Sequence, residues 1–368
     1  MKTPLLNIQN LEISFKREKE FLPIIKRINY TLESNEILGI VGESGSGKSV
    51  SSLAIVGLLP QNISKVSDGE IVFEGKNIAT LSKKELQNLR GKQISMIFQE
   101  PMSSLNPSLK CGFQVAEILE QHTNLSKKEI KQEVLQLFSR VKLPDPEKIY
   151  ESYPHQISGG QKQRVMIAMA IACKPKVLIA DEPTTALDVT VQNEIIQLLK
   201  DIQQETGMSI IFISHDLALV SEIANRVLVM YQGEIVEQGS AVDVFHNPQH
   251  IYTQALISSR PSLAVRLKRL PTIKDYLENS VKSEIITSEE RKKAQEKLYR
   301  QDPILEVRNV EKEYFSTAGL FGKKTGFKAV NDVSFKIYEG ETLGLVGESG
   351  CGKSTLGNTI LQLDKATS

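Results

Sequence analysis

The chain has 368 residues, a length that allows two domains, and its 40% hydrophobic and 24% charged residues are ordinary for a globular protein. The formal net charge of +1 gives no basic field of the kind that attracts nucleic acid, so nucleic acid is not expected as a partner. No apolar run approaches the roughly 18 residues of a membrane-spanning helix, so any membrane connection is expected to run through a partner.

The predicted elements follow one another in a regular order. Residues 5–15 alternate apolar and polar positions and predict an early strand. The apolar run Ile37–Val41 predicts a buried strand that ends in a glycine-rich turn, and residues 48–58 predict the next helix. Residues 82–173 are predicted to be mostly helical, with S-x-x-E capping boxes starting at Ser82 and Ser126. Residues 176–236 alternate strand-like runs with helical segments, which is typical of a mostly parallel sheet.

The same order begins again near the end of the chain. Residues 262–302, rich in Lys, Arg and Glu, predict a charged linker with a solvated helix near 288–299. Residues 305–314 repeat the pattern of the first strand, and the apolar run 343–346, in the place of the strand Ile37–Val41, is predicted to feed a second glycine-rich loop. We therefore predict a complete domain at 1–258, a linker at 259–302 and the start of a second domain at 303–368.

Both loops match G-x-x-x-x-G-K-[ST], with GESGSGKS at 42–49 and GESGCGKS at 347–354. The glycines let backbone N–H groups turn toward a phosphate chain, and the helix that begins near Lys48 points its positive end at the same phosphates. Lys48 would reach the β- and γ-phosphates of ATP, and the Ser49 hydroxyl would bind Mg²⁺. An incidental glycine turn is the alternative, which the flanking strand and helix disfavour. The nucleotide-binding residues predicted in the first loop are Gly42, Glu43, Ser44, Gly45, Ser46, Gly47, Lys48, Ser49 and Val50.

Four polar residues follow strand-like runs and are predicted to join the first loop. Asp181 would hold Mg²⁺ through water, and Glu182 would polarise the attacking water. Taken alone, an acidic pair at a strand end is equally well explained as a solvent-exposed edge without a function. His215 is predicted to sense the γ-phosphate, and Gln99 to join the Mg²⁺ and water shell. A lone histidine or glutamine in these places would more often be structural, so both predictions depend on the loop.

A second predicted anion site lies at residues 158–161, where Ser158, Gly159, Gly160 and Gln161 precede a long apolar helix. In isolation these residues would favour an ordinary glycine turn. A phosphate-loop ATPase does not need a second anion site in the same domain, so its presence indicates that ATP is bound between two domains.

The ordered set of GESGSGKS, Gln99, SGGQ, Asp181–Glu182, TALD at 185–188 and His215 resembles the ATP-binding cassette (ABC) family. The resemblance implies an α/β fold: a phosphate-loop NTPase cassette with a RecA-like parallel core, an antiparallel β subdomain and a helical subdomain, followed by the start of a second cassette. It implies that residues 158–161 are the signature motif, 185–188 the D-loop and His215 the switch histidine. It also implies that Phe15 stacks on adenine, with Tyr314 as its counterpart in the repeat.

The residues predicted around the first loop form a catalytic group and a group of Mg²⁺ ligands. The catalytic residues are Glu182, His215 and Gln99, and the Mg²⁺ ligands are Ser49, Gln99 and Asp181. The second loop adds the nucleotide-binding candidates Gly347, Gly350, Gly352, Lys353, Ser354 and Thr355.

Residues 97–107, 153–171 and 247–261 narrow the resemblance to the oligopeptide/dipeptide/nickel importer ATPases. This implies an ATP-hydrolysing subunit on the cytoplasmic face of the inner membrane, using ATP and Mg²⁺. The implied partners are two transmembrane permease subunits, indirectly a substrate-binding protein, and a second cassette in a longer chain, a separate chain or a homodimer. A soluble tandem cassette acting on ribosomes or DNA, and an inactive remnant, are the alternatives.

The chain resembles the N-terminal two-thirds of a fused double ATPase. Residues 303–368 hold the edge strands and loop of a cassette without its signature, acidic pair or switch histidine. We expect this piece not to bury a normal cassette core, and to bind ATP at best without hydrolysing it. A homodimer of the first cassettes would supply two complete sites.

Overall fold

The computed structural model describes residues 3–99, 104–185, 187–259, 265–278, 280–281, 284–317, 324–348 and 350–368. The chain forms two units: Met1–Leu187, Val191–Arg260 and Pro271–Val281 make the first, and Asp188–Thr190, Pro261–Leu270 and Lys282–Ser368 make the second. The domain boundaries at 258 and 303 stay predictions. Within the described residues, no helix combines the length and the apolar character needed to cross a membrane.

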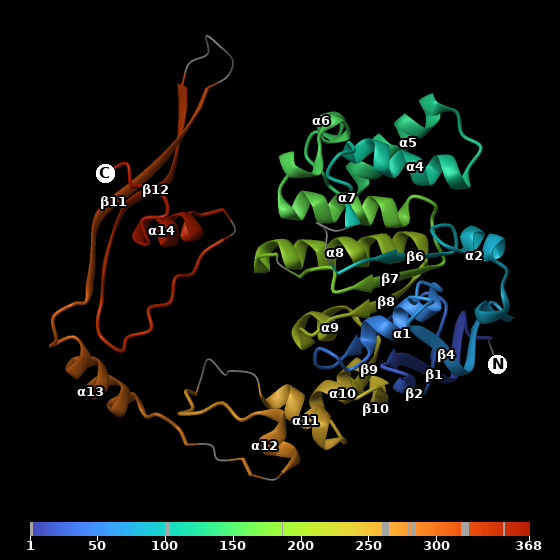
Figure 1. Ribbon diagram of the computed structural model, residues 1–368, viewed down its shortest axis with the longest axis horizontal. Coiled ribbons are helices and arrows are strands. Elements are labelled where there is room, and N and C mark those ends of the chain that lie inside the picture. Colours follow the sequence, from blue (N-terminus) through green and yellow to red (C-terminus); the bar gives the residue numbers. More distant parts are fainter. Residues whose placement is uncertain are drawn as a thin grey trace. The chain divides into compact units, whose positions relative to one another are not determined.

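A six-stranded sheet forms the centre of the first unit (Figure 1). Its order is β10-β9-β3-β8-β7-β6, and every pair is parallel except β10 with β9. The strands are β3 (Ile37–Val41), β6 (Ile94–Ile97), β7 (Val177–Asp181), β8 (Ser209–Ile213), β9 (Arg226–Tyr231) and β10 (Glu234–Ser240). All five residues of β3, β7 and β8 are buried. Continuous apolar runs are the expected pattern for strands covered on both faces.

The two faces of this sheet belong to two hydrophobic cores. Along β8, Ile210 and Phe212 join one core, while Ile211 and Ile213 join the other, because successive side chains point to opposite faces of a strand. The first core holds the helices α8 (Val189–Thr206), α9 (Leu217–Ile223), α10 (Ala241–His246) and α11 (Ile251–Ser258), together with helices from the stretch between β6 and β7. The second core holds α1 (Lys48–Ile55) and the inner face of an antiparallel sheet.

This antiparallel sheet has the order β2-β1-β4-β5. It consists of β1 (Leu6–Arg17), β2 (Glu20–Leu32), β4 (Ser64–Phe73) and β5 (Lys76–Asn77), and the short helix η1 (Ile78–Thr80) follows it. β1 confirms the early strand predicted at 5–15.

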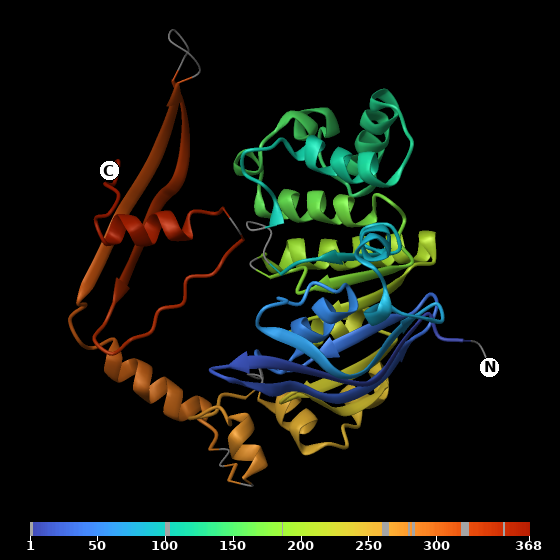
Figure 2. The ribbon, with the colours of Figure 1, turned by 45° about the vertical axis from the view of Figure 1, so that its right-hand side comes forward.

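Residues 82–173 are mostly helical, as predicted. One strand within this stretch, β6, belongs to the central sheet. The helices of the stretch are α2 (Lys83–Leu89), α4 (Cys111–His122), α5 (Lys127–Arg140), α6 (Pro146–Glu151), η2 (Pro154–Gln156) and α7 (Gly159–Ile171). Both predicted capping boxes form, at Ser82 with Glu85 and at Ser126 with Glu129. Figures 1 and 2 show α4 to α7 gathered on the side of the first unit away from the antiparallel sheet. The helix α12 (Ile273–Leu277) follows α11 in the first unit, and its Ile273 packs against the first core.

The second unit contains a long antiparallel hairpin, β11 (Leu305–Thr317) with β12 (Lys324–Ile337). The helix α13 (Ser288–Leu298) matches the solvated helix predicted near 288–299, and α14 (Lys353–Ile360) begins at the second loop. The strand predicted at 343–346 is wrong, because residues 341–348 have no regular secondary structure. A parallel strand needs neighbours for its N–H and C=O groups, and among the described residues of this unit the sheet has only the strands β11 and β12.

Candidate nucleotide-binding site

The first glycine-rich loop connects the end of β3 to the start of α1. Gly42 has φ 152°, and a Cβ atom there would come within 2.2 Å of the Met230 carbonyl oxygen. Gly47, the N-cap of α1, has φ 105°, and its Cβ would come within 2.4 Å of the Ile25 side chain. Only glycine fits both positions, for conformational and for steric reasons. The loop is therefore pressed against β9 and β2, with Glu43, Ser44 and Gly45 on its exposed side.

Lys48 lies almost completely buried behind this loop, with 5% of its surface exposed. Its Nζ donates to the carbonyl oxygens of Gly42 at 2.8 Å and Glu43 at 2.9 Å. Burial lowers the pKa of Lys48, while the carboxylates of Glu182, Asp181 and Glu43 act in the opposite direction. The amine is thus held at the inner side of the loop whose backbone would surround a phosphate chain.

The neighbouring Ser49 contacts the acidic residue at the end of β7. Its Oγ donates to Asp181 Oδ1 at 3.1 Å. Burial, followed by a smaller contribution from Glu182, raises the pKa of Asp181, although the Ser49 hydrogen bond and Lys48 oppose this. A serine hydroxyl and a carboxylate this close offer the hard oxygen ligands that Mg²⁺ prefers, so these residues fit the predicted metal.

Glu182 is the centre of a second cluster at the same edge of the sheet. Its Oε2 accepts from Gln99 Nε2 at 3.0 Å and from Thr185 Oγ1 at 2.9 Å, and lies 3.2 Å from His215 Nδ1. Burial alone would raise the pKa of Glu182, but the hydrogen bonds from Thr185, His215 and Gln99 together with the charge of His215 lower it. This carboxylate is held ionised, as a base that polarises water must be.

These residues come together because of the sheet topology. The strands β3, β8, β7 and β6 are neighbours in the parallel sheet. Gln99, Asp181 and His215 lie at or just beyond the carboxyl ends of β6, β7 and β8, and Ser49 lies at the start of α1, after the loop that follows β3. In open α/β sheets, ligands bind at this edge. Glu182 itself has φ 48°, a value uncommon for residues other than glycine, where the chain turns away from β7.

The predicted signature residues lie elsewhere, at the start of α7. Ser158 accepts from the Gln161 N–H, and Gln161 Oε1 accepts from the Ser158 N–H at 2.9 Å, which makes a capping box. Within the described part of the chain, no hydrogen bond joins this segment to the first loop. Phe15 lies half-buried on β1, and Val50 lies half-buried on α1. Of the D-loop at 185–188, Ala186 lies outside the described residues.

The second loop has the same internal geometry. Gly347, Gly350 and Gly352 have φ values of 155°, 79° and 98°, and Lys353 Nζ donates to the carbonyl oxygens of Gly347 at 2.7 Å and Glu348 at 2.6 Å. Ser354 is exposed and Thr355 half-buried at the start of α14. Tyr314 on β11 donates to Asp364 Oδ2, so its hydroxyl is tied to the end of the chain.

Sequence reasoning missed two contacts of the first site. Thr185 was named only as part of the D-loop, yet its hydroxyl holds Glu182. Tyr252 lies in the stretch 247–261, which was used only for the family resemblance, yet its buried hydroxyl accepts from the Glu43 N–H at 3.0 Å. Neither contact leaves a periodic signal, because each joins residues through the fold.

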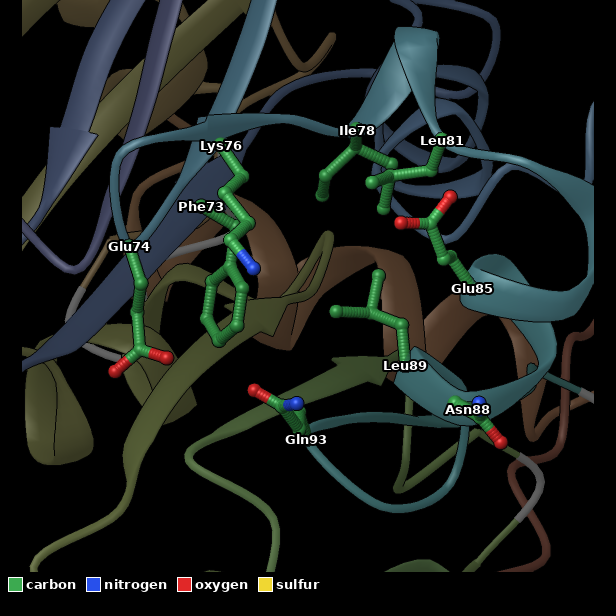
Figure 3. A pocket seen from close by; sticks show the side chains of 9 residues that line it. All are labelled: Phe73, Glu74, Lys76, Ile78, Leu81, Glu85, Asn88, Leu89 and Gln93. Carbon is green, nitrogen blue, oxygen red and sulfur yellow. The ribbon is translucent and has the colours of Figure 1, made fainter.

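A separate cavity of about 270 Å³ lies between the antiparallel sheet and α2 (Figure 3). Its side chains come mainly from β4, β5, η1 and α2, and apolar groups alternate around it with charged and amide groups. It is lined by Phe73, Glu74, Lys76, Ile78, Leu81, Glu85, Asn88, Leu89 and Gln93. None of the predicted site residues is among them, so this cavity is distinct from the nucleotide site.

A buried strand, a glycine-rich loop, a lysine at the start of the next helix and an acidic pair at a nearby strand end together define a P-loop nucleotide-binding cassette. The chain belongs to the ABC transporter family, whose family model matches residues 25–185 and 330–368. A second family model, described as the oligopeptide/dipeptide transporter C-terminal region, matches residues 236–284.

The chain is similar to the glutathione import ATP-binding protein GsiA of Escherichia coli, with 44% identity over 370 residues. The alignment covers 98% of this chain and 58% of that relative, so the chain spans little more than half the length of the curated relatives it matches. Among solved structures, it is similar to a dimeric post-hydrolysis state of the ATP-binding cassette MJ0796 bound to ADP and Pi. That match has 29% identity and a TM-score of 0.58, and it covers 64% of this chain and 98% of the other. CbiO1 from Clostridium perfringens, part of the ABC transporter complex cbiONQ, has 31% identity and a TM-score of 0.58, covering 67% and 92%.

Proposed function

We propose that this chain is the ATP-binding and ATP-hydrolysing subunit of an ABC importer for peptides or related small solutes. The observation that carries the proposal is the pair of clusters at one sheet edge: Ser49 with Asp181, and Glu182 with Gln99 and His215. The first offers oxygen ligands beside a phosphate loop, and the second offers an ionised carboxylate with polar neighbours. Together they suit the attack of water on a terminal phosphate.

Each residue then has a role in binding or in proton handling. The loop backbone and Lys48 bind the β- and γ-phosphates, and Phe15 stacks on adenine. Ser49 and Asp181, with the amide of Gln99, would hold Mg²⁺, which neutralises phosphate charge when bound. Glu182 polarises the attacking water, and His215 contacts the γ-phosphate from the next strand.

The separation of residues 158–161 from the first loop supports a site completed by another cassette. We propose that the start of α7 supplies an anion site to the loop of a second cassette, in a longer chain, in a separate chain or in a homodimer. Closure of the two cassettes over ATP, and opening after hydrolysis, would then drive two permease subunits from the cytoplasmic face of the membrane.

The cargo class is proposed from the tail segment, residues 236–284. The match of residues 236–284 to the oligopeptide/dipeptide transporter C-terminal region, and the similarity to proteins named for glutathione import, support peptides or peptide-like solutes delivered by a separate binding protein.

The test is the ATPase activity of the purified chain with Glu182→Gln. The amide cannot accept a proton, so we expect hydrolysis to fall by about 10²–10⁴-fold while ATP binding persists. Glu205→Gln is the matched control, because Glu205 forms an exposed ion pair with Arg140 on the surface of the same unit. Retention of activity by Glu182→Gln would contradict the proposed mechanism. Specific activity that does not rise with protein concentration would count against a homodimer as the active form.

A further inference from the structure

We propose that Tyr252, on the tail helix α11, is a positioning residue for the first phosphate loop. In this proposal its hydroxyl fixes one peptide group of the loop, and that peptide group holds Lys48 in place for the phosphates. The inference rests on the proposed function, because it concerns ATP binding at the same loop. It gives the tail segment a direct part in the nucleotide site, 209 residues away from the loop in sequence.

The contact is made to the peptide group that joins Gly42 and Glu43. The carbonyl oxygen of this group accepts from Lys48 Nζ at 2.8 Å, and its N–H donates to Tyr252 Oη at 3.0 Å. In a trans peptide the C=O and N–H bonds point in opposite directions. The peptide plane is therefore fixed from both sides, by the lysine and by the tyrosine, and each hydrogen bond polarises the group toward the other.

Tyr252 is itself held firmly. Its side chain is fully buried, and its ring lies against Tyr231 at the end of β9, with centroids 4.1 Å apart and planes at 31°. Its backbone N–H donates to His250 Nδ1 at 3.1 Å. Burial raises the pKa of Tyr252 to about 12, so the hydroxyl stays neutral and its oxygen remains available to the Glu43 N–H at any physiological pH.

The tail helix is in turn anchored to the central sheet. The N–H groups of Gln249 and His250 donate to the Glu237 carboxylate on β10, at 2.8 and 3.1 Å. β10 pairs with β9, and the turn between them donates the Gly233 N–H to the Ser46 carbonyl at 3.0 Å. The loop is thus held at Ser46 by this turn and at Glu43 by α11. Residues 237–252, within the segment that matches the transporter C-terminal region, provide the second of these supports.

A structural role and a positioning role make different predictions for Tyr252→Phe. The phenylalanine keeps the ring and its packing against Tyr231 but leaves the Glu43 N–H without its acceptor. If the hydroxyl only stabilised the fold, its loss would reduce the fraction of folded chain without changing the affinity of the folded molecules. If it positions the loop, the affinity for ATP must fall in chains that remain folded.

The experiment is isothermal titration of the full chain with ATP and Mg²⁺, in a Lys353→Ala background that removes the second loop from the measurement. We expect Tyr252→Phe to raise the Kd about tenfold with the binding stoichiometry unchanged, as the loss of one buried hydrogen bond implies. Tyr276→Phe, on α12 of the same tail, is the matched control and should bind like the parent. An unchanged Kd for Tyr252→Phe, or a lower stoichiometry alone, would overturn the inference and leave the proposed function standing. A parent that does not bind ATP would overturn both.

Hydrogen exchange gives a second measurement that does not depend on the variant folding. In the unsubstituted chain without nucleotide, the Glu43 amide should exchange about tenfold or more slowly than the exposed Ser44 and Gly45 amides. Exchange of all three amides at the same rate would also overturn the inference.

Discussion

The two phosphate loops of this chain have almost the same backbone and very different surroundings. The three glycines of the first loop have φ values of 152°, 82° and 105°, and those of the second have 155°, 79° and 98°. In both loops the lysine amine donates to two carbonyl oxygens at the start of the loop. The conformation of the loop is therefore encoded locally, in eight residues.

The segments that precede the two loops differ completely. In the first unit, Leu38, Ile40 and Val41 are fully buried in β3, which pairs with β8 and β9. The equivalent Leu343, Leu345 and Val346 are 45%, 52% and 90% exposed, and no strand forms. Nearly identical sequences thus give a core strand in one place and an open segment in the other. A parallel strand therefore depends on its neighbours, while the conformation of a glycine loop depends on its own residues.

Hydrogen exchange should show the largest difference between the two regions. The amides of residues 38–41 lie in the centre of the sheet and should exchange only when the whole first unit unfolds. Their protection factors should therefore exceed about 10⁴. The amides of 343–346 should exchange within about tenfold of the rate of an unfolded peptide. Mass spectrometry of peptides covering both segments measures this, with the paired strand β11 as an internal control. Strong protection at 343–346 would mean that this segment pairs with another strand in solution. That result would contradict the difference described between the two segments.

Truncation of equivalent core residues should separate the two regions by a smaller amount. Ile40→Ala creates a cavity between β3 and the antiparallel sheet and should lower the free energy of unfolding of the first unit by about 2–5 kcal/mol. Leu345→Ala removes an exposed side chain and should change the free energy of unfolding by no more than about 0.5 kcal/mol. Urea denaturation followed by far-ultraviolet circular dichroism compares the pair. Equal losses for the two variants would show that Leu345 is packed in the molecule as it exists in solution.

Much of the fold was predictable because its signals are local. The buried run Ile37–Val41, the capping boxes at Ser82 and Ser126, and the position of Asp181 at a strand end can all be read from neighbouring residues. The wrong prediction at 343–346 has the same origin. An apolar run shows what a segment would bury, and it does not show whether other strands are there to cover it.

For the candidate site, the sequence proposes the residues and does not indicate which of them touch. Gln99 and His215 were expected near the phosphates, and the structure shows both side chains on Glu182. Those contacts depend on the order of β6, β7 and β8, which no local pattern encodes. The Tyr252 contact with Glu43 depends on α11 packing beside β9, so only the folded chain reveals it.

The smallest expected difference concerns nucleotide binding by the two lysines. Lys48 is almost fully buried against a loop that is held by β9 and α11, whereas the hydrogen bonds of Lys353 lie exposed, in a loop that follows directly on residues 341–348, which form no strand. A charge-assisted hydrogen bond made by a preorganised group contributes more than the same bond made by a mobile one. We expect Lys48→Ala to weaken the tighter ATP site about 10- to 100-fold, and Lys353→Ala to change the affinity of that site less than about threefold. Titration with ATP and Mg²⁺, fitted to two sites, measures both. If Lys353→Ala weakens the tighter site as strongly as Lys48→Ala does, then the eight residues of a loop are enough to bind phosphate tightly. The surrounding sheet would then contribute little to ATP affinity.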